Sequence, residues 1–297
     1  MEEYLSYLKS KGRFTSWLIV IFLLILAIPI LIQIELTFVA KIIGLLLIVI
    51  SSVALFYWVR KVAGSKVIKN RVALNANDRF WLNENIPFYR LLTRQEKGIF
   101  EDRMSLFLAE IIITDVSKEV PDKAECFFVA ASAIIAYWGL PYWNYGNLKE
   151  VLVYPDNFDE NKLVSAKGHI LGSVHHGGLM DGTMILSRTA LIAGFRNSKD
   201  GRNVGIHEFT HLLDKSDGHI DGLPVGLTSE QRKIWLTVYR NEVNSPDFHL
   251  DRYALTNEAE FFAVSMEMYK ENPSVLLKWH PELHAILSDY FNKLPVN

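Results

Sequence analysis

The sequence predicts an α+β domain, mostly helical with a small mixed sheet, preceded by two transmembrane helices. Two long uncharged apolar runs open the chain, and several later segments repeat apolar residues at helical spacing. After the apolar runs, only two short segments are rich in β-branched and aliphatic residues. At 297 residues, the chain has room for one sizeable domain and this additional N-terminal segment.

The two apolar runs, residues 14–34 and 42–59, contain no charged side chain. Each is close to the roughly 20 residues that cross a bilayer as a helix. A cleaved signal peptide would have one shorter apolar core followed by a cleavage site, and a buried helical hairpin would carry a polar stripe. We therefore expect residues 1–59 to form a transmembrane hairpin in contact with the lipid bilayer.

Basic residues around the two spans predict their orientation. The connection between the spans offers only Lys41, whereas the outer flanks carry Lys9, Lys11, Arg13, Arg60, Lys61, Lys66, Lys69 and Arg71. We expect a two-pass protein of the inner (cytoplasmic) membrane whose domain faces the cytoplasm. The single cysteine, Cys126, agrees with a reducing compartment. A net charge of −2, without a basic patch among aromatic residues, predicts no nucleic-acid partner.

Residues 60–86 are basic and polar and are expected to form a juxtamembrane linker, with the domain proper at 87–297. Apolar spacing and turn signals predict helices over residues 92–110, 121–138, 204–214, 229–244, 257–271 and 281–294.

Two short runs, residues 150–154 and 183–186, are predicted strands. The segment between them, residues 168–182, is rich in glycine and histidine and is compatible with an irregular edge strand or a loop. We expect its histidines, His169, His175 and His176, to be polar loop residues because their spacing matches no known zinc pattern.

A candidate metal site lies in the predicted helix 204–214. His207 and His211 are four residues apart, so both imidazoles can reach one ion while Glu208 stands beside the open coordination position as a general base. At 100° a residue, apolar side chains occupy the opposite side of this helix. A solvated helix face with a chance motif is the alternative interpretation.

Asp214 and Glu260 are the candidate supporting carboxylates. Asp214 could accept a hydrogen bond from the second ring nitrogen of a ligating histidine, although a solvent-facing helix end would also explain it. Glu260 could be the third ligand, because the apolar face of its helix can pack on the histidine helix. Asn257 and Glu260 also have the spacing of a capping box, which would use the same carboxylate differently. Two histidines and a carboxylate suit zinc, and iron or cobalt can bind the same set.

Two segments, NVGIHEFTHLLD (203–214) and DRYALTNEAEFFAV (251–264), resemble the zinc-dependent peptidases of the Mlc titration factor A family. The resemblance covers residues 88–297 and implies a zincin-like metallopeptidase domain with one Zn²⁺ per chain, held by His207, His211 and Glu260. The downstream segment is also similar to that of anthrax lethal factor. That likeness implies a catalytic role for Tyr253, whose phenol could donate to the oxyanion; an ordinary half-buried tyrosine is the alternative.

The predicted function is that of a membrane-anchored zinc-dependent peptidase. Glu208 would act as the general base toward a peptide or protein substrate, which would pair with an exposed strand near residues 183–186. One alternative is a membrane-tethered protein that sequesters a cytoplasmic regulator, because the resemblance allows a regulatory protein partner. A second is a zinc-stabilised structural domain, in which Glu208 would be dispensable.

Overall fold

The computed structural model describes residues 73–292, except 142, 144, 158–171, 175–181 and 247–248, together with residue 71 and scattered positions from 40 to 55. The chain divides into two compact units, Met1–Arg71 and Val72–Asn297. In the first unit the described positions from 40 to 55 are helical. The predicted span 14–34 lies outside the described residues, as do both ends of 42–59. Within the described residues, no helix is both long and apolar enough to span a bilayer.

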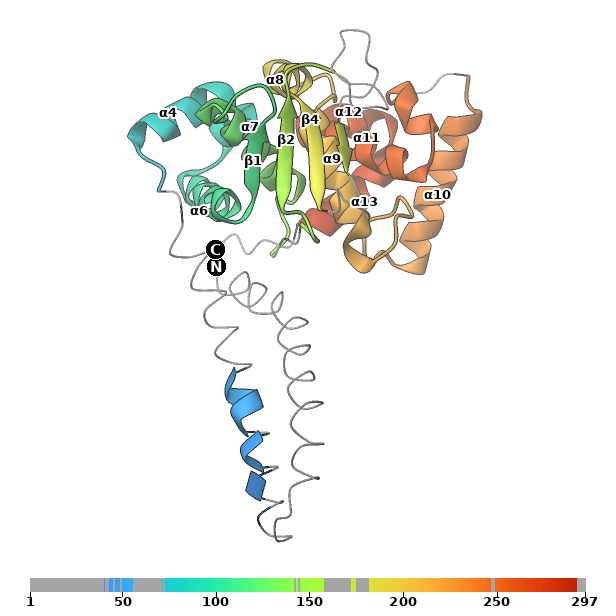
Figure 1. Cartoon of the computed structure of the whole chain (residues 1–297). Coiled ribbons are helices and arrows are strands. Elements are labelled where there is room, and N and C mark those ends of the chain that lie inside the picture. The colour runs from blue at the N-terminus through green and yellow to red at the C-terminus, as the bar shows by residue number, and fades with distance from the viewer. Residues whose placement is uncertain are drawn as a thin grey trace. The chain divides into compact units, whose positions relative to one another are not determined.

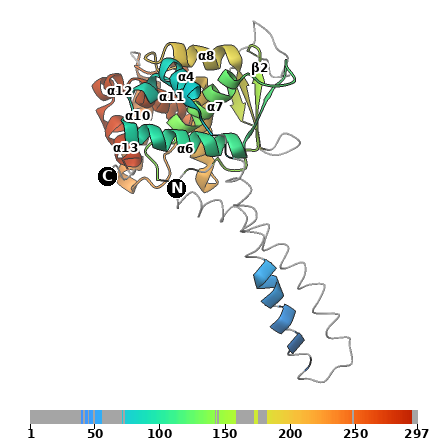
Figure 2. The same cartoon turned by 90° about the vertical axis from the view of Figure 1, so that its left-hand side faces the viewer.

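The second unit is an α+β domain in which helices predominate (Figures 1 and 2). Its α-helices are α4 (Ala76–Asn85), α5 (Pro87–Leu91), α6 (Arg94–Glu110), α7 (Lys123–Ala136), α8 (Arg188–Arg196), α9 (Val204–Asp214), α10 (Ser229–Asn244), α11 (Glu258–Glu271), α12 (Pro273–Trp279) and α13 (Pro281–Phe291). Its strands are β1 (Ile112–Asp115), β2 (Glu150–Tyr154), β3 (Gly172–Val174) and β4 (Thr183–Ser187). There are also two 3₁₀ helices. η2 (Lys215–Asp217) follows α9, and η3 (Arg252–Leu255) precedes α11.

The four strands form one mixed sheet in the order β1-β2-β4-β3. β1, β2 and β4 run parallel, and β3 pairs antiparallel with β4 through Gly172 and Leu186. The predicted small mixed sheet is confirmed, and the segment 168–182 contributes an edge strand. The expectation that residues 183–186 form an exposed strand is wrong, because β4 has β2 on one side and β3 on the other.

The six predicted helices are present, with ends shifted by a few residues at most. The structured unit, however, begins earlier than residue 87, because α4 occupies part of the predicted linker. Reciprocal capping by Asn75 and Asp78 starts this helix. Leu82 is fully buried, and Trp81 packs edge-on against Phe128 with ring centroids 5.0 Å apart. The linker expectation therefore fails from residue 76 onward.

The helix that carries the histidines lies at the centre of the helical part. α9 packs against α7, which is buried along nearly its whole length, and against α11. Close approach of α9 to α7 requires Gly205, because a Cβ there would lie 2.0 Å from the Ser132 hydroxyl oxygen. Figures 1 and 2 show α10 to α13 gathered to one side of the sheet. This packing places the start of α11 beside the middle of α9.

Candidate active site

The sequence of α9 explains why this segment is helical and which side it buries. The Asn203 side chain accepts a hydrogen bond from the Ile206 N–H and caps the helix N-terminus. The apolar side of α9 is buried: Phe209 packs edge-on against Phe107 and Tyr145 at centroid distances of 5.8 and 5.6 Å. The other side therefore presents the two histidines toward α11.

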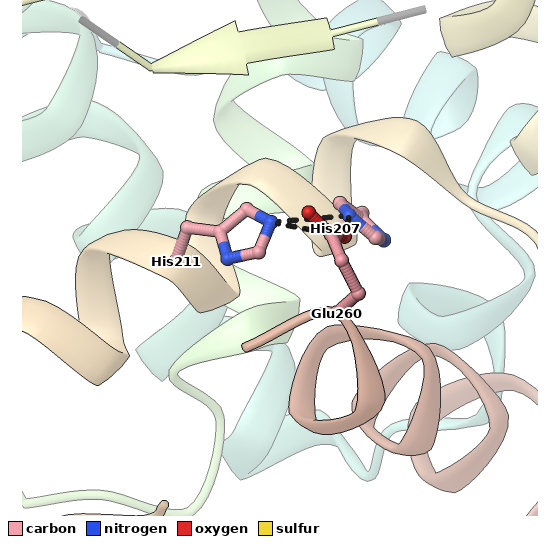
Figure 3. A group of neighbouring side chains, drawn as sticks. All are labelled: His207, His211 and Glu260. Atoms are coloured by element: carbon pink, nitrogen blue, oxygen red, sulfur yellow. Dashed lines mark hydrogen bonds and ion pairs between the residues drawn. The ribbon is translucent and has the colours of Figure 1, made fainter. Parts of the chain in front are cut away.

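Three side chains from two helices converge at one point (Figure 3). His207 Nε2 lies 2.8 Å from Glu260 Oε2 and 3.1 Å from His211 Nε2, and His211 Nε2 lies 3.5 Å from the same Glu260 oxygen. Ligands about 2.0 Å from a tetrahedral ion are separated by roughly 3.3 Å, so these atoms are spaced to hold a metal with small adjustments. The predicted trio is thus brought together.

Glu260 faces the histidines rather than the end of its own helix. Its backbone N–H donates to the Asn257 side chain at 2.9 Å, so Asn257 caps α11. Its carboxylate instead meets His207 and His211. Asn257 therefore caps the helix through the Glu260 backbone N–H, whereas the Glu260 carboxylate points to the candidate metal site.

The carboxylate that contacts the second nitrogen of His207 belongs to Glu267. Its Oε1 lies 2.7 Å from His207 Nδ1, and its Oε2 accepts a short hydrogen bond from the backbone N–H of Asn203. A carboxylate at Nδ1 favours a hydrogen on that nitrogen, which would leave Nε2 free to bind a metal. Sequence analysis missed this residue. The available signal was its spacing, seven residues or two helical turns after Glu260.

Asp214, the predicted partner of a ligating histidine, has a different position. It is 1% exposed, and its carboxylate accepts hydrogen bonds from the backbone N–H groups of Asp221 and Gly222 at 3.1 to 3.3 Å. It therefore stabilises the loop that follows α9 and is not a solvent-facing helix end. The carboxylate that contacts the second ring nitrogen of a candidate histidine ligand is thus Glu267 and not the predicted Asp214.

Burial and charge shift the protonation of the site. Burial alone would lower the pKa of His207, but the charge of Glu267 and the hydrogen bond to Glu260 outweigh it and raise that pKa well above its ordinary value. Burial likewise opposes ionisation of Glu260, yet hydrogen bonds with both histidines lower its pKa to about 2. Glu260 is therefore a carboxylate at neutral pH, the form that binds a cation.

Glu208 is 5% exposed, and burial raises the pKa of its carboxyl group. The edge strand β3 lies directly against it: a Cβ built on Gly172 would come within 2.6 Å of Glu208 Oε1. The short strand with grey ends that crosses Figure 3 above the histidines is β3. Glu208 is thus held between the histidine helix and the sheet edge.

Tyr253 lies at the open side of the site. Asp251 caps η3, and the Tyr253 ring centroid lies 5.7 Å from that of His207. The residue is 55% exposed, so about half of its surface is buried beside the candidate metal site. Burial of its hydroxyl and the charges of Glu260 and Glu208 raise the pKa, which keeps the phenol protonated as a donor. The three loop histidines, His169, His175 and His176, lie outside the described residues.

An α+β domain with two histidines on one helix, a carboxylate on a second and a buried glutamate beside them has the layout of a metallopeptidase domain. The model of the family "Glucose-regulated metallo-peptidase M90" matches residues 58–292. The chain belongs to this family.

Individual relatives agree with that placement at low identity. An uncharacterized protein of Synechocystis sp., slr2042, is 29% identical over 224 residues, which cover 71% of this chain and 81% of the relative. Mlc titration factor A of Pectobacterium atrosepticum is 23% identical over 211 residues, 64% of this chain and 73% of the relative. Its namesake in Yersinia pestis is 25% identical over 164 residues, 50% and 59% of the two chains. The family resemblance stated from the two motif segments is confirmed.

Proposed function

We propose that the chain is a zinc-dependent peptidase whose metal is held by His207, His211 and Glu260. The observation that carries the proposal is the convergence of these three donors beside a buried glutamate, Glu208. Two imidazole nitrogens and one carboxylate oxygen are a typical catalytic zinc set. Zinc bound there would supply a lowered water pKa and polarisation of the substrate carbonyl.

The remaining chemistry belongs to the side chains. Glu208 takes a proton from the attacking water and passes it to the amine nitrogen that leaves as the peptide bond breaks. The raised pKa of Glu208 suits a group that must both accept and return a proton. Tyr253 donates its phenol hydrogen to the carbonyl oxygen as negative charge develops there. Glu267 keeps His207 in one tautomer and orientation.

A peptide substrate would bind along β3. This strand ends the sheet order within the described residues, and peptides add to such edges through main-chain hydrogen bonds. Gly172 lies in β3 against Glu208, so an added strand would pass beside the general base. A substrate bound in this way would have its scissile carbonyl near the three donors.

The decisive experiment compares the full chain with its Glu208→Gln variant, both purified in detergent. We expect equal zinc content in the two proteins and a loss of reporter-peptide hydrolysis on the order of 10²- to 10⁴-fold in the variant. Glu230→Gln, at an exposed position of α10, is the matched control and should keep wild-type activity. Hydrolysis by the variant at the wild-type rate would refute the role of Glu208.

We also propose that residues 1–59 anchor the domain to the inner membrane with the catalytic unit in the cytoplasm. The support is the pair of uncharged runs and the exposure of five apolar side chains along the described helical positions: Ile43, Leu46, Leu47, Ile50 and Val53 are 48 to 62% exposed. In a Cys126→Ser background, Thr37→Cys should react with an impermeant maleimide added to spheroplasts, and Asn297→Cys only after lysis. The reverse pattern would invert the topology.

A second candidate function is sequestration of a cytoplasmic regulator at the membrane. The observation in its favour is the name of two relatives, Mlc titration factor A, which describes titration of Mlc. The comparison of wild type with Glu208→Gln also distinguishes the two functions. Stoichiometric zinc with equal, negligible hydrolysis in wild type and Glu208→Gln would support the binding protein and exclude the peptidase.

A further inference from the structure

A second group of metal-binding side chains lies in the C-terminal helices and shares no residue with the first site. Glu242 is in the last turn of α10, His249 is in the connection to η3, and His280 joins α12 to α13. One potential ligand atom of each lies within 4.8 Å of the other two. Glu242 Oε1 is 3.5 Å from His280 Nε2 and 3.9 Å from His249 Nδ1.

Neighbouring contacts hold these groups in a facing arrangement. The second Glu242 oxygen, Oε2, accepts a hydrogen bond from the His249 backbone N–H at 3.1 Å. The His249 ring is stacked on Trp279, with centroids 4.0 Å apart and planes 19° from parallel. Contacts of this kind orient the ligands of metal sites. Here they direct one carboxylate oxygen and two imidazoles toward the same space.

Among the residues that the structure describes, one of these buried donors makes no hydrogen bond, although Glu242 Oε1 lies 3.5 Å from it. His280 is 6% exposed, and within the described part of the chain its Nε2 atom has no hydrogen-bond partner. Such a buried nitrogen normally carries a stability cost, so a satisfied arrangement needs an additional group. Glu242 is also 6% exposed, whereas the His249 side chain is 32% exposed. The trio is therefore buried on one side and reachable from solvent on the other.

We propose that Glu242, His249 and His280 bind a second divalent cation. Two imidazole nitrogens and a carboxylate oxygen favour zinc, with water from the open side completing the coordination. A simple ion pair between Glu242 and His280 would not require the stacked His249 ring or leave His280 Nε2 without a hydrogen bond. The ion would tie the end of α10 to the junction of α12 and α13.

The second ion would also stabilise the connection that leads to Tyr253. His249 lies four residues before Tyr253, so a bound ion fixes the connection that leads into η3. This role is stabilising and does not depend on the proposed peptidase activity. Loss of activity in Glu208→Gln and loss of an ion in a His249 variant report on separate proposals.

The test is the zinc count of the full chain, measured by mass spectrometry of the metal after removal of free zinc. We expect two ions per chain in wild type, one in His249→Ala, one in His211→Ala and none in the double variant. His219→Ala is the matched control and should keep two, because His219 is a 79% exposed histidine outside both groups. Zinc should raise the Tm of His211→Ala and leave that of the double variant unchanged.

Two outcomes would overturn the second site. One is a wild-type count of one ion or fewer, and the other is a count of two retained by His249→Ala. Because His249 is partly exposed, its replacement should preserve folding. Equal Tm of wild type and His249→Ala in excess chelator checks this. Glu242→Gln, which keeps the shape of the side chain, should reproduce the loss of one ion.

Discussion

The two oxygens of Glu267 have separate roles. One contacts His207 Nδ1, and the other accepts the backbone N–H of Asn203, the residue that caps α9. A neutral amide at this position would keep the shape but remove the charge that fixes the histidine tautomer. The effect should appear in metal binding before it appears in the fold.

We therefore predict that Glu267→Gln weakens zinc binding by about 10- to 100-fold, the usual effect of losing an outer carboxylate. Competition with a chelator of known affinity measures it. Glu230→Gln, which removes an exposed carboxylate of α10, should bind zinc as wild type does. Wild-type zinc affinity in Glu267→Gln would show that the contact with His207 has no role in metal binding.

Gly172 provides a second test at the scale of one residue. A Cβ there would lie 2.6 Å from Glu208 Oε1, so Gly172→Ala must displace Glu208, the proposed general base, or the edge strand. We expect kcat/KM to fall at least about 10-fold, because misplaced catalytic groups lose rate steeply, while the zinc content stays unchanged. Gly98→Ala is the control, since nothing lies within 4 Å of a Cβ at that position. Unchanged kinetics in Gly172→Ala would argue against a catalytic contact between β3 and Glu208.

Sequence reasoning at this scale succeeded where residues share one helix. His207 and His211 follow from helical spacing in α9. For Glu260, which lies in another helix, the spacing left a metal ligand and a capping residue open, and only the family resemblance implied the ligand. Glu267 was not predicted because its partners, Asn203 and His207, lie 64 and 60 residues earlier in the chain. Asp214 was misassigned because the periodicity of α9 places it on the same side of the helix as the histidines. Periodicity cannot show that the Asp214 oxygens accept hydrogen bonds from backbone N–H groups of the following loop.

At the scale of elements, a partly buried charge cluster joins β1, α7 and α8. Asp115 at the end of β1 contacts Arg188 at the start of α8, and Arg188 also contacts Glu125 of α7. Lys118 lies 3.3 Å from Asp115 and 3.2 Å from Glu125. Burial opposes the charge of Asp115, but hydrogen bonds with Ser117 and Lys118 and the charge of Arg188 outweigh it and lower the pKa to about 2.

This pKa predicts how the stability depends on pH. Because the folded pKa lies below the ordinary value of 3.8, Asp115 stabilises the fold above that value, and the contribution is lost as the pH falls toward 2. We expect a contribution on the order of 1–2 kcal/mol. Urea unfolding at pH 7 and at pH 3 should show a smaller difference in Asp115→Asn than in wild type. Equal differences in the two proteins would show that this carboxylate does not contribute.

Two elements that the sequence did not predict, β1 and α8, have weak local signals. β1 has only four residues and follows α6 after a single residue, without a glycine or proline to mark the change. α8 begins directly where β4 ends, since Ser187 is both the last strand residue and the helix cap. The pairing of β1 with β2, 38 residues later, and the contact of Arg188 with Asp115 stabilise these segments.

At the scale of the whole molecule, α4 sets the boundary of the folded unit. A fragment of residues 72–297 keeps Trp81 and Leu82 in their packing sites, whereas a fragment of residues 87–297 exposes the surface that they cover. We expect the shorter fragment to be less stable by roughly 3–5 kcal/mol, the cost typical of losing a large buried side chain. Thermal unfolding of both fragments gives the comparison, and equal Tm values would restore residue 87 as the boundary.

The order of the site residues along the chain has a consequence for biosynthesis. Both histidines are made well before Glu260 and Glu267, which lie 53 and 60 residues after His207. A nascent chain on the ribosome therefore presents the histidine helix without its carboxylate partners until α11 has emerged. The proposed peptidase would stay inert throughout most of its own translation, when neighbouring unfolded segments are the nearest possible substrates.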